Sequence, residues 1–176
     1  FRDCGVPVWD ADAAVHRLYA RDGAVVALMK AAFPEAIEDG AVSRERLKAI
    51  IAKTPDALRQ IETIVHPLVA RDRAEFLGAT SADITVLDIP LLFETGGDAR
   101  MDAVVCVTIP RDIQRQRVLD RGTMTEEQFE AILAKQMPND EKCACSDYVV
   151  ETDTLDHARV QVKEILRDIR GKLSDA

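Results

Sequence analysis

Two aspartates, Asp10 and Asp12, follow a short apolar segment and are candidates for acid–base chemistry. Val6–Asp10 predicts a short strand, and Ala11–Ala20 then changes to helical spacing. A carboxylate at the carboxyl end of a strand can orient or deprotonate a hydroxyl group. Asp12 can also act as the N-cap of a helix over 13–20, because its side chain accepts hydrogen bonds from free N–H groups. One residue can do both, so both interpretations stay open.

Asp88 places a charge within the apolar segment Ile84–Leu92, which predicts a buried strand running into a loop. A buried carboxylate destabilises a fold unless it is paired. The pattern is typical of the strand on the Mg²⁺ side of phosphate-loop nucleoside triphosphatases, where Asp88 would hold Mg²⁺, directly or through water. Alternatively, Asp88 caps a backbone group or pairs with an arginine.

Four arginines share the predicted helix Arg111–Arg121, which Gly122 ends. At 100° per residue, Gln114, Arg117 and Arg121 fall within a sector of roughly 60°, away from Arg111 and Arg115. Two guanidinium groups on one face can bind phosphate oxygens through paired hydrogen bonds. The alternative is a solvated face that pairs with neighbouring acids, namely Asp112 and Asp120.

His66-Pro67 follows a helical pattern and has two interpretations. It is either a hinge between two helices or a place where His66 lines a pocket for an anionic substrate. Lys135 and Lys142 flank a Pro-Asn-Asp turn, and we expect both to be solvated.

The cysteines do not indicate a metal site. Only Cys143 and Cys145 are close in sequence, and no C-x-x-C pair or nearby histidine completes a zinc ligand set. Cys106 lies in an apolar run and is expected to be a small buried hydrophobic residue. We therefore expect free thiols in a reducing compartment, which indicates the cytoplasm, and a metal or redox site is the alternative.

These candidates require a scaffold of alternating strands and helices. The remaining strands are predicted over Ala103–Ile109 and Asp147–Glu151, and the helical run over 24–80 is too long for one crossover and indicates an inserted subdomain. The pattern predicts an α/β fold with a parallel sheet covered on both faces. Ligands of such sheets bind beyond the carboxyl ends of the strands.

Helix signals refine this scaffold. Thr54-Pro55 predicts an N-cap followed by proline at the first helical position, and Pro67 is expected to break that helix and begin another. Thr125-Glu-Glu-Gln128 is a capping box that opens a helix running through Gln136. The apolar spacing from Val162 to Leu173 predicts a C-terminal amphipathic helix.

The 176 residues suit one domain, and 31 acidic against 23 basic residues give a formal charge of −8. This balance argues against a general nucleic-acid binder, whose surface carries a basic face. No apolar run reaches the ~20 residues of a membrane span. We expect a soluble protein with small-molecule partners, no nucleic acid and no membrane; the sequence indicates no oligomeric state.

Several of these motifs occur together and in order. They are Val8-Trp-Asp-Ala-Asp12, His66-Pro-Leu68, Asp88-Ile-Pro-Leu-Leu-Phe-Glu94, Gln114-x-x-Arg117, and Gln136 followed by Asp147-Tyr-Val-Val150. In this combination the chain resembles the dephospho-coenzyme A kinase family over nearly its whole length. The resemblance implies transfer of the γ-phosphoryl group of ATP to the ribose 3′-hydroxyl of dephospho-coenzyme A, with ATP as co-substrate and Mg²⁺ as cofactor. It also implies a P-loop NTPase-like, three-layer α/β/α kinase core over 1–176, with a helical acceptor-binding insertion at 24–80 and a lid at 111–146.

The resemblance also implies roles for individual residues. Asp12 corresponds to the catalytic carboxylate that accepts or orients the proton of the ribose hydroxyl. Arg117 would bridge the transferring phosphates, with Arg121 as a helper, and Asp88 is the candidate metal residue. The residues implied to line the acceptor pocket are His66, Pro90, Leu91, Leu92 and Glu94.

Two features depart from the family pattern. The phosphate-binding loop G-x-x-x-x-G-K-[ST] is absent from the sequence. In the family it lies just before the helix whose end matches Phe1–Gly5, where Gly5 is predicted to be the C-cap. We therefore expect ~20 residues, a strand and this loop, to precede Phe1. A chain without the loop should bind ATP weakly and catalyse little. In addition, Glu151-Thr-Asp-Thr154 replaces an Asn and a Gly that usually lie near the adenine.

Two other functions remain open at this stage. The first is another small-molecule or nucleoside monophosphate kinase, which would share the arginine-bearing lid. The second is a protein without catalysis that binds a coenzyme A-like ligand or a partner. A phosphate loop encoded upstream of Phe1 would favour an enzyme, whereas a start codon at or just before Phe1 would favour the binding protein.

Overall fold

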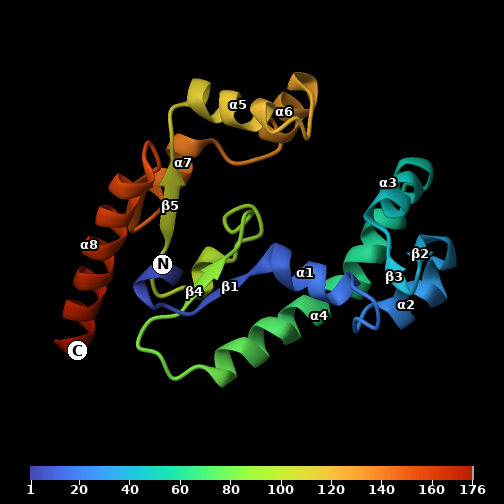
Figure 1. The fold of residues 1–176 in the computed structure, drawn as a ribbon, viewed down its shortest axis with the longest axis horizontal. Coiled ribbons are helices and arrows are strands. Elements are labelled where there is room, and N and C mark those ends of the chain that lie inside the picture. Colours follow the sequence, from blue (N-terminus) through green and yellow to red (C-terminus); the bar gives the residue numbers. More distant parts are fainter. Residues whose placement is uncertain (176) are drawn as a thin grey trace. The chain divides into compact units, whose positions relative to one another are not determined.

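The computed structural model describes residues 1–175 and divides the chain into two compact units, Phe1–Ile89 and Pro90–Ala176 (Figure 1). Both units combine helices with a pair of parallel strands, as the alternating sequence pattern predicts. Among the described residues, none of the helices combines the length and apolar character that a membrane span requires.

The first unit carries the aspartates of the opening segment. Its strands are β1 (Val8–Asp10), β2 (Ile37–Glu38), β3 (Ala41–Val42) and β4 (Val86–Asp88). Its α-helices are α1 (Ala11–Tyr19), α2 (Val26–Ala32), α3 (Arg44–Lys53) and α4 (Ala57–Ala79). Short 3₁₀ helices span Arg2–Cys4 and Pro34–Ala36. Gly5 ends the first of these with a left-handed φ of 75°, so the predicted glycine C-cap is confirmed.

Strands β1 and β4 pair in parallel and lie side by side in Figure 1. Their register places Val8 opposite Val86 and Asp10 opposite Asp88. Both strands therefore end at the same level with an aspartate, and the acidic residues that follow them share one edge of the sheet. The strand around Asp88 is shorter than predicted: only Val86–Asp88 is extended, and Asp88 itself is exposed rather than buried.

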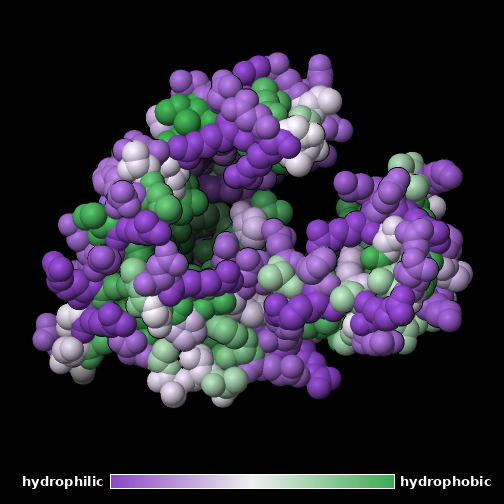
Figure 2. Space-filling model, in the orientation of Figure 1, coloured by the Kyte–Doolittle hydropathy of each residue, from purple (hydrophilic) through white to green (hydrophobic). Residues whose placement is uncertain are grey.

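The helices predicted between 24 and 80 share a hydrophobic core with α1. It joins apolar residues of α1 to α4, with Val25 and Met29 fully buried. Figure 2 shows mainly hydrophilic residues on the outside of α2 and α3, as expected when their apolar faces point into this core.

Two local predictions for this region are wrong, and one hairpin lies where no strand was predicted. Helix α4 begins at Ala57 after Asp56, so Thr54 does not cap it. Pro67 lies inside α4 and does not divide it, because Val65 and its neighbours along the helix stay packed in the core. The hairpin β2–β3 was missed, since strands of two residues show no alternation. Its turn residues Asp39 and Gly40 have φ angles of 49° and 77°, which the Asp-Gly pair favours.

The second unit carries the arginines. Its strands are β5 (Val105–Thr108) and β6 (Tyr148–Glu151). Its α-helices are α5 (Arg111–Asp120), α6 (Glu126–Leu133), α7 (Asn139–Ala144) and α8 (Leu155–Ser174), and a 3₁₀ helix spans Asp98–Arg100. Strands β5 and β6 pair in parallel with Thr108 opposite Glu151, and α8 packs on β6. The buried residues of α8 are Val162, Ile165 and Leu166.

The capping box of α6 is confirmed: Gln128 N donates to Thr125 Oγ1, and Thr125 N donates to Gln128 Oε1. The helix ends at Leu133 rather than Gln136, and the chain continues in turns to Pro138. The short helix α7 then follows, where the sequence had indicated only a turn, because six residues are too few to show a helical period.

Candidate functional site

The carboxyl edge of β1 and β4 gathers three aspartates. Asp10 caps α1, since Ala13 N donates to Asp10 Oδ1 at 2.8 Å. The interpretation of Asp12 as the N-cap is therefore wrong: α1 starts at Ala11, and Asp12 lies in its first turn. The Asp12 side chain is exposed and makes no hydrogen bond or ion pair with the rest of residues 1–175. Its carboxylate is thus available to a ligand.

The negative charges at this edge act on Asp88. Partial burial of the carboxyl group raises the pKa of Asp88, and the charges of Asp10 and Asp12 raise it further, while Arg2 has a smaller opposite effect. Arg2 lies on the same side, with its guanidinium 4.0 Å from Asp10. No group of three or more His, Cys, Asp or Glu side chains in the described part of the chain could hold a metal ion unaided. A cation here would need further ligands from its substrate.

Helix α4 holds His66 and is tied to the opening strand. His66 is exposed, and no other described residue bonds to its ring. Farther along α4, Asp72 Oδ1 accepts a hydrogen bond from buried Trp9 Nε1 at 2.7 Å and one from Arg17 at 2.6 Å. Burial raises the pKa of Asp72, but these two bonds outweigh it and leave the pKa lowered.

The segment Pro90–Glu94 forms consecutive turns rather than a strand. Thr95 closes these turns by donating from its backbone and side chain to Leu91 O, at 3.2 and 2.8 Å. Leu91 is 43% exposed, whereas Leu92 is half-buried. Apolar surface in this segment is therefore accessible to a ligand.

Glu94 is held by two donors at one oxygen. Lys142 Nζ lies 2.7 Å from Glu94 Oε1, and Met137 N donates to the same oxygen at 3.0 Å. Burial raises the pKa of Glu94, but the bond from Lys142 and the backbone N–H groups outweigh it and lower the pKa. The prediction that Lys142 is solvated is wrong, because its side chain is only 16% exposed. Lys135, in contrast, is exposed as predicted.

Arginines of α5 divide into two groups. Arg111 pairs with Glu130 at 2.8 Å, and Arg115 pairs with Glu126, so both cross-link α5 to α6. The predicted alternative, in which the face of Arg117 and Arg121 pairs with Asp112 and Asp120, does not concern these two arginines, which lie on another face of α5. The partners come from the next helix, which one-helix spacing does not reveal.

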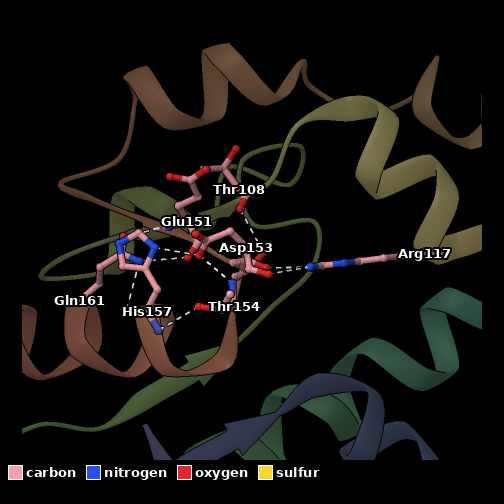
Figure 3. Close-up of polar contacts among 8 residues, drawn as sticks. Thr108, Arg117, Glu151, Asp153, Thr154, His157 and Gln161 are labelled. Atoms are coloured by element: carbon pink, nitrogen blue, oxygen red, sulfur yellow. Dashed lines mark hydrogen bonds and ion pairs between the residues drawn. The ribbon is translucent and has the colours of Figure 1, made fainter.

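Arg117 leaves this helix pair and reaches the loop after β6 (Figure 3). Its Nη1 donates to Thr152 O at 2.8 Å and its Nη2 to Asp153 O at 3.0 Å. Arg121, which shares its predicted face, makes no side-chain hydrogen bond or ion pair with any other described residue. The two guanidinium groups are thus in different states, one held by backbone carbonyls and the other available.

The loop after β6 is itself well ordered by polar contacts that the sequence did not reveal. Asp153 accepts from Thr154 N at 2.6 Å and contacts His157 Nδ1 at 2.7 Å, and these two groups, in that order, lower the pKa of Asp153 (Figure 3). Thr154 caps α8 through His157 N. In the sequence, Thr154 is a signal for the start of α8. It gives no indication that Arg117 contacts this loop.

The structure also brings two cysteines together that the sequence keeps apart. Cys143 Sγ on α7 lies 3.7 Å from Cys106 Sγ on β5, whereas Cys145 is exposed. Burial and the neighbouring Cys143 raise the pKa of Cys106 to about 11. The prediction that Cys106 is a buried apolar residue is confirmed.

Comparison with known proteins identifies relatives over nearly the whole chain. The family model described as dephospho-CoA kinase matches residues 1–157. Two curated relatives, both named dephospho-CoA kinase, are from Ruegeria pomeroyi and Cereibacter sphaeroides. The first is 66% identical over 97% of this chain and 87% of its own length. The second is 55% identical over 97% of this chain and 86% of its own length.

Two solved structures are similar to this chain in fold. A crystal structure of a Thermus thermophilus protein matches 95% of this chain and 86% of its own, with a TM-score of 0.80 and 31% identity. A dephospho-CoA kinase from Campylobacter jejuni matches 97% of this chain and 89% of its own in fold, with a TM-score of 0.69 and 22% identity.

Proposed function

The chain belongs to the dephospho-CoA kinase family, an enzyme family with a P-loop NTPase-like α/β fold, and we propose specific roles for its residues in the phosphorylation of dephospho-CoA. The reaction transfers a phosphoryl group from ATP to dephospho-CoA and yields CoA. Both substrates are small molecules. The roles below are assigned to side chains of this chain, with the ribose 3′-hydroxyl as the acceptor atom.

Asp12 is the catalytic carboxylate. The observation that carries this role is its position: it is exposed, it has no side-chain partner among residues 1–175, and it follows the carboxyl end of β1. Asp10, by contrast, is occupied as a helix cap. Asp12 accepts a hydrogen bond from the ribose hydroxyl and orients its oxygen for in-line attack on the γ-phosphorus. The O–P bond to ADP breaks as the new O–P bond forms, and the hydroxyl proton passes to the carboxylate.

Acceptor binding is assigned to residues of the helical insertion at 24–80 and to the segment Pro90–Glu94, as the family resemblance implies. His66, on the exposed side of α4, contributes a polar group without an internal partner. Pro90, Leu91 and Leu92 contribute apolar surface, of which Leu91 is the most accessible. Glu94 anchors this segment through its bonds to Lys142 and Met137.

Arg117 and Arg121 bind the phosphates from the lid segment 111–146. Both are exposed arginines near the end of α5, and a guanidinium group can donate two parallel hydrogen bonds to phosphate oxygens. Arg117 must exchange its bonds to Thr152 O and Asp153 O for bonds to phosphate. Closure of this segment would exclude water and so prevent simple hydrolysis of ATP.

Mg²⁺ suits the acidic edge of β1 and β4. Mg²⁺ is usually held by one or two carboxylates together with substrate phosphates and waters, so the lack of a three-ligand cluster in the described residues does not conflict with it. Asp88 would hold it, because this carboxylate ends β4 opposite Asp10, where a cation would offset the negative charges of the neighbouring aspartates. When bound, the ion neutralises charge on the phosphoryl oxygens.

The free thiols favour a cytoplasmic enzyme.

The substitution Asp12→Asn tests the catalytic role. Measured on the complete gene product, we expect kcat to fall about 100-fold or more while the affinity for ATP changes little. Glu62→Gln is the matched control, because Glu62 is an exposed carboxylate on α4 without a partner among the described residues. Near-normal turnover of Asp12→Asn with dephospho-CoA would refute the role.

A further inference from the structure

We propose that Lys142 is a positioning residue for the acceptor: through Glu94, it holds the Pro90–Glu94 turns in the conformation that binds dephospho-CoA. This inference rests on the proposed function, which places those turns at the acceptor pocket. It gives a role to Lys142, which the sequence analysis predicted only to be solvated.

Both partners of this contact are largely buried, unlike those of a surface ion pair. The side chains of Lys142 and Glu94 are 16% and 17% exposed, although the backbone of Glu94 leaves that residue exposed as a whole. The lysine of a surface pair such as Lys172–Asp168 is 69% exposed. Withdrawing an ammonium group from water costs free energy unless a partner compensates, so the Lys142 side chain has one favourable position, on Glu94.

Helix α7, which carries Lys142, is held in place by several contacts. Helix α7 packs on β5, where Asn139 Nδ2 donates to Thr108 Oγ1 at 2.8 Å. Ser146 Oγ donates to the carbonyl of Lys142 at 2.7 Å. The ammonium group is therefore carried by a helix that is itself fixed to the sheet.

Glu94 then fixes two segments at once. Its Oε1 accepts from Lys142 and also from the backbone N–H of Met137, which lies in the turns between α6 and α7. The turns that contain Leu91 are thus joined to the point where the proposed lid segment returns to the sheet. Removing the Lys142 charge leaves the Glu94 carboxylate with backbone N–H groups alone, those of Met137 and of Glu94 itself, and the carboxylate can then leave this position for water.

The expected effect is on acceptor binding more than on ATP binding. Lys142→Gln, in the complete gene product, should raise KM for dephospho-CoA about tenfold and leave KM for ATP nearly unchanged. Lys142→Arg keeps the charge and should restore most of the acceptor affinity. Lys135→Gln is the matched control, because Lys135 lies seven residues earlier and is exposed.

A double substitution tests whether Lys142 acts through Glu94. If it does, Lys142→Gln added to Glu94→Gln should change the acceptor KM by less than about twofold, because the contact is already lost. A purely destabilising substitution would lower the folded fraction, and with it the apparent kcat, without changing KM. Should Lys142→Gln not fold, Glu94→Gln alone supplies the measurement, with the same expected rise in acceptor KM.

Three results would overturn the inference: an unchanged acceptor KM in both single variants, an equal rise in both KM values, or multiplicative effects in the double variant. Leu91→Ala separates this failure from failure of the proposed function. If Leu91→Ala raises the acceptor KM while the Lys142 and Glu94 variants do not, only the positioning role falls. If Leu91→Ala is also without effect, the acceptor pocket has been placed wrongly.

Discussion

The indole N–H of Trp9 donates to the carboxylate of Asp72 at 2.7 Å, across 63 residues of sequence. This bond joins β1 to α4, and Arg17 of α1 donates to the same oxygen. Trp9 is 3% exposed and immediately precedes Asp10, so the contact fixes the strand that leads to Asp12 against the helix that carries His66. Asp72 thereby connects β1 to α4, the two elements that position Asp12 and His66 in the proposed mechanism.

Asp72→Ala should therefore destabilise the first unit. The buried N–H of Trp9 would lose its acceptor, which costs about 1–3 kcal/mol in the free energy of unfolding. Asp72→Asn keeps an acceptor oxygen for Trp9 and should cost less. Urea denaturation followed by tryptophan fluorescence measures both, since Trp9 is the only tryptophan. Equal losses for Ala and Asn would show that the bond to Trp9 contributes nothing.

The same contact predicts a pH dependence. The pKa of Asp72 is lowered in the folded protein, so its stabilisation is fully present above the ordinary aspartate pKa of about 3.9. It is lost as the pH falls through the lowered folded-state pKa. The stability difference between the wild type and Asp72→Asn should accordingly be constant near pH 7 and shrink below about pH 4. A difference that grows on acidification would contradict this sign.

Arg117→Lys should lower kcat about 100-fold, because an ammonium group cannot replace two parallel guanidinium bonds to phosphate. Steady-state kinetics with dephospho-CoA and ATP is the measurement. The matched control is Arg111→Lys, an arginine of the same helix that pairs with Glu130. If Arg117 serves only to tether α5 to Thr152 and Asp153, its substitution will lower thermal stability and leave kcat like that of the control.

Asp88→Asn should stabilise the fold while reducing activity. A raised folded-state pKa means that the folded protein binds the proton more tightly than the unfolded chain. Protonated Asp88 therefore favours folding at low pH, and this advantage is lost as the pH rises through the raised pKa. At neutral pH the neutral asparagine removes the repulsion from Asp10 and Asp12. Thermal unfolding at pH 7 should show a small gain, limited by solvent screening. A lower Tm together with normal activity would contradict both expectations.

Cys106 should be the least reactive thiol at neutral pH. With its pKa raised to about 11, only about one molecule in 10⁴ carries the reactive thiolate at pH 7. Alkylation followed by peptide mass spectrometry should label the exposed Cys145 first and Cys106 last, with the Cys106 rate rising up to about pH 11. Cys143→Ser should speed labelling of Cys106, because Cys143 contributes to the raised pKa. Rapid labelling of Cys106 at pH 7 would contradict the shift.

Local sequence signals predicted the features that depend on residues close in sequence. The Thr125 capping box, the glycine cap at Gly5 and the strand before Asp12 are confirmed, because each depends on backbone hydrogen bonds between near neighbours. Local signals failed where packing outweighed them. Pro67 stays inside α4 because Ile61 and Val65 are held in the core.

By itself the sequence determined the α/β class and the order of the motifs, because these follow from residue types and their spacing along the chain, and the kinase family followed from the resemblance of those motifs to a known family. Only the tertiary structure decided which polar groups meet. It pairs Lys142 with Glu94 and hydrogen-bonds Trp9 to Asp72. It also brings Arg117 to the backbone carbonyls that follow β6. These partners lie 35 or more residues apart in sequence, and such contacts exist only once packing has brought their elements together.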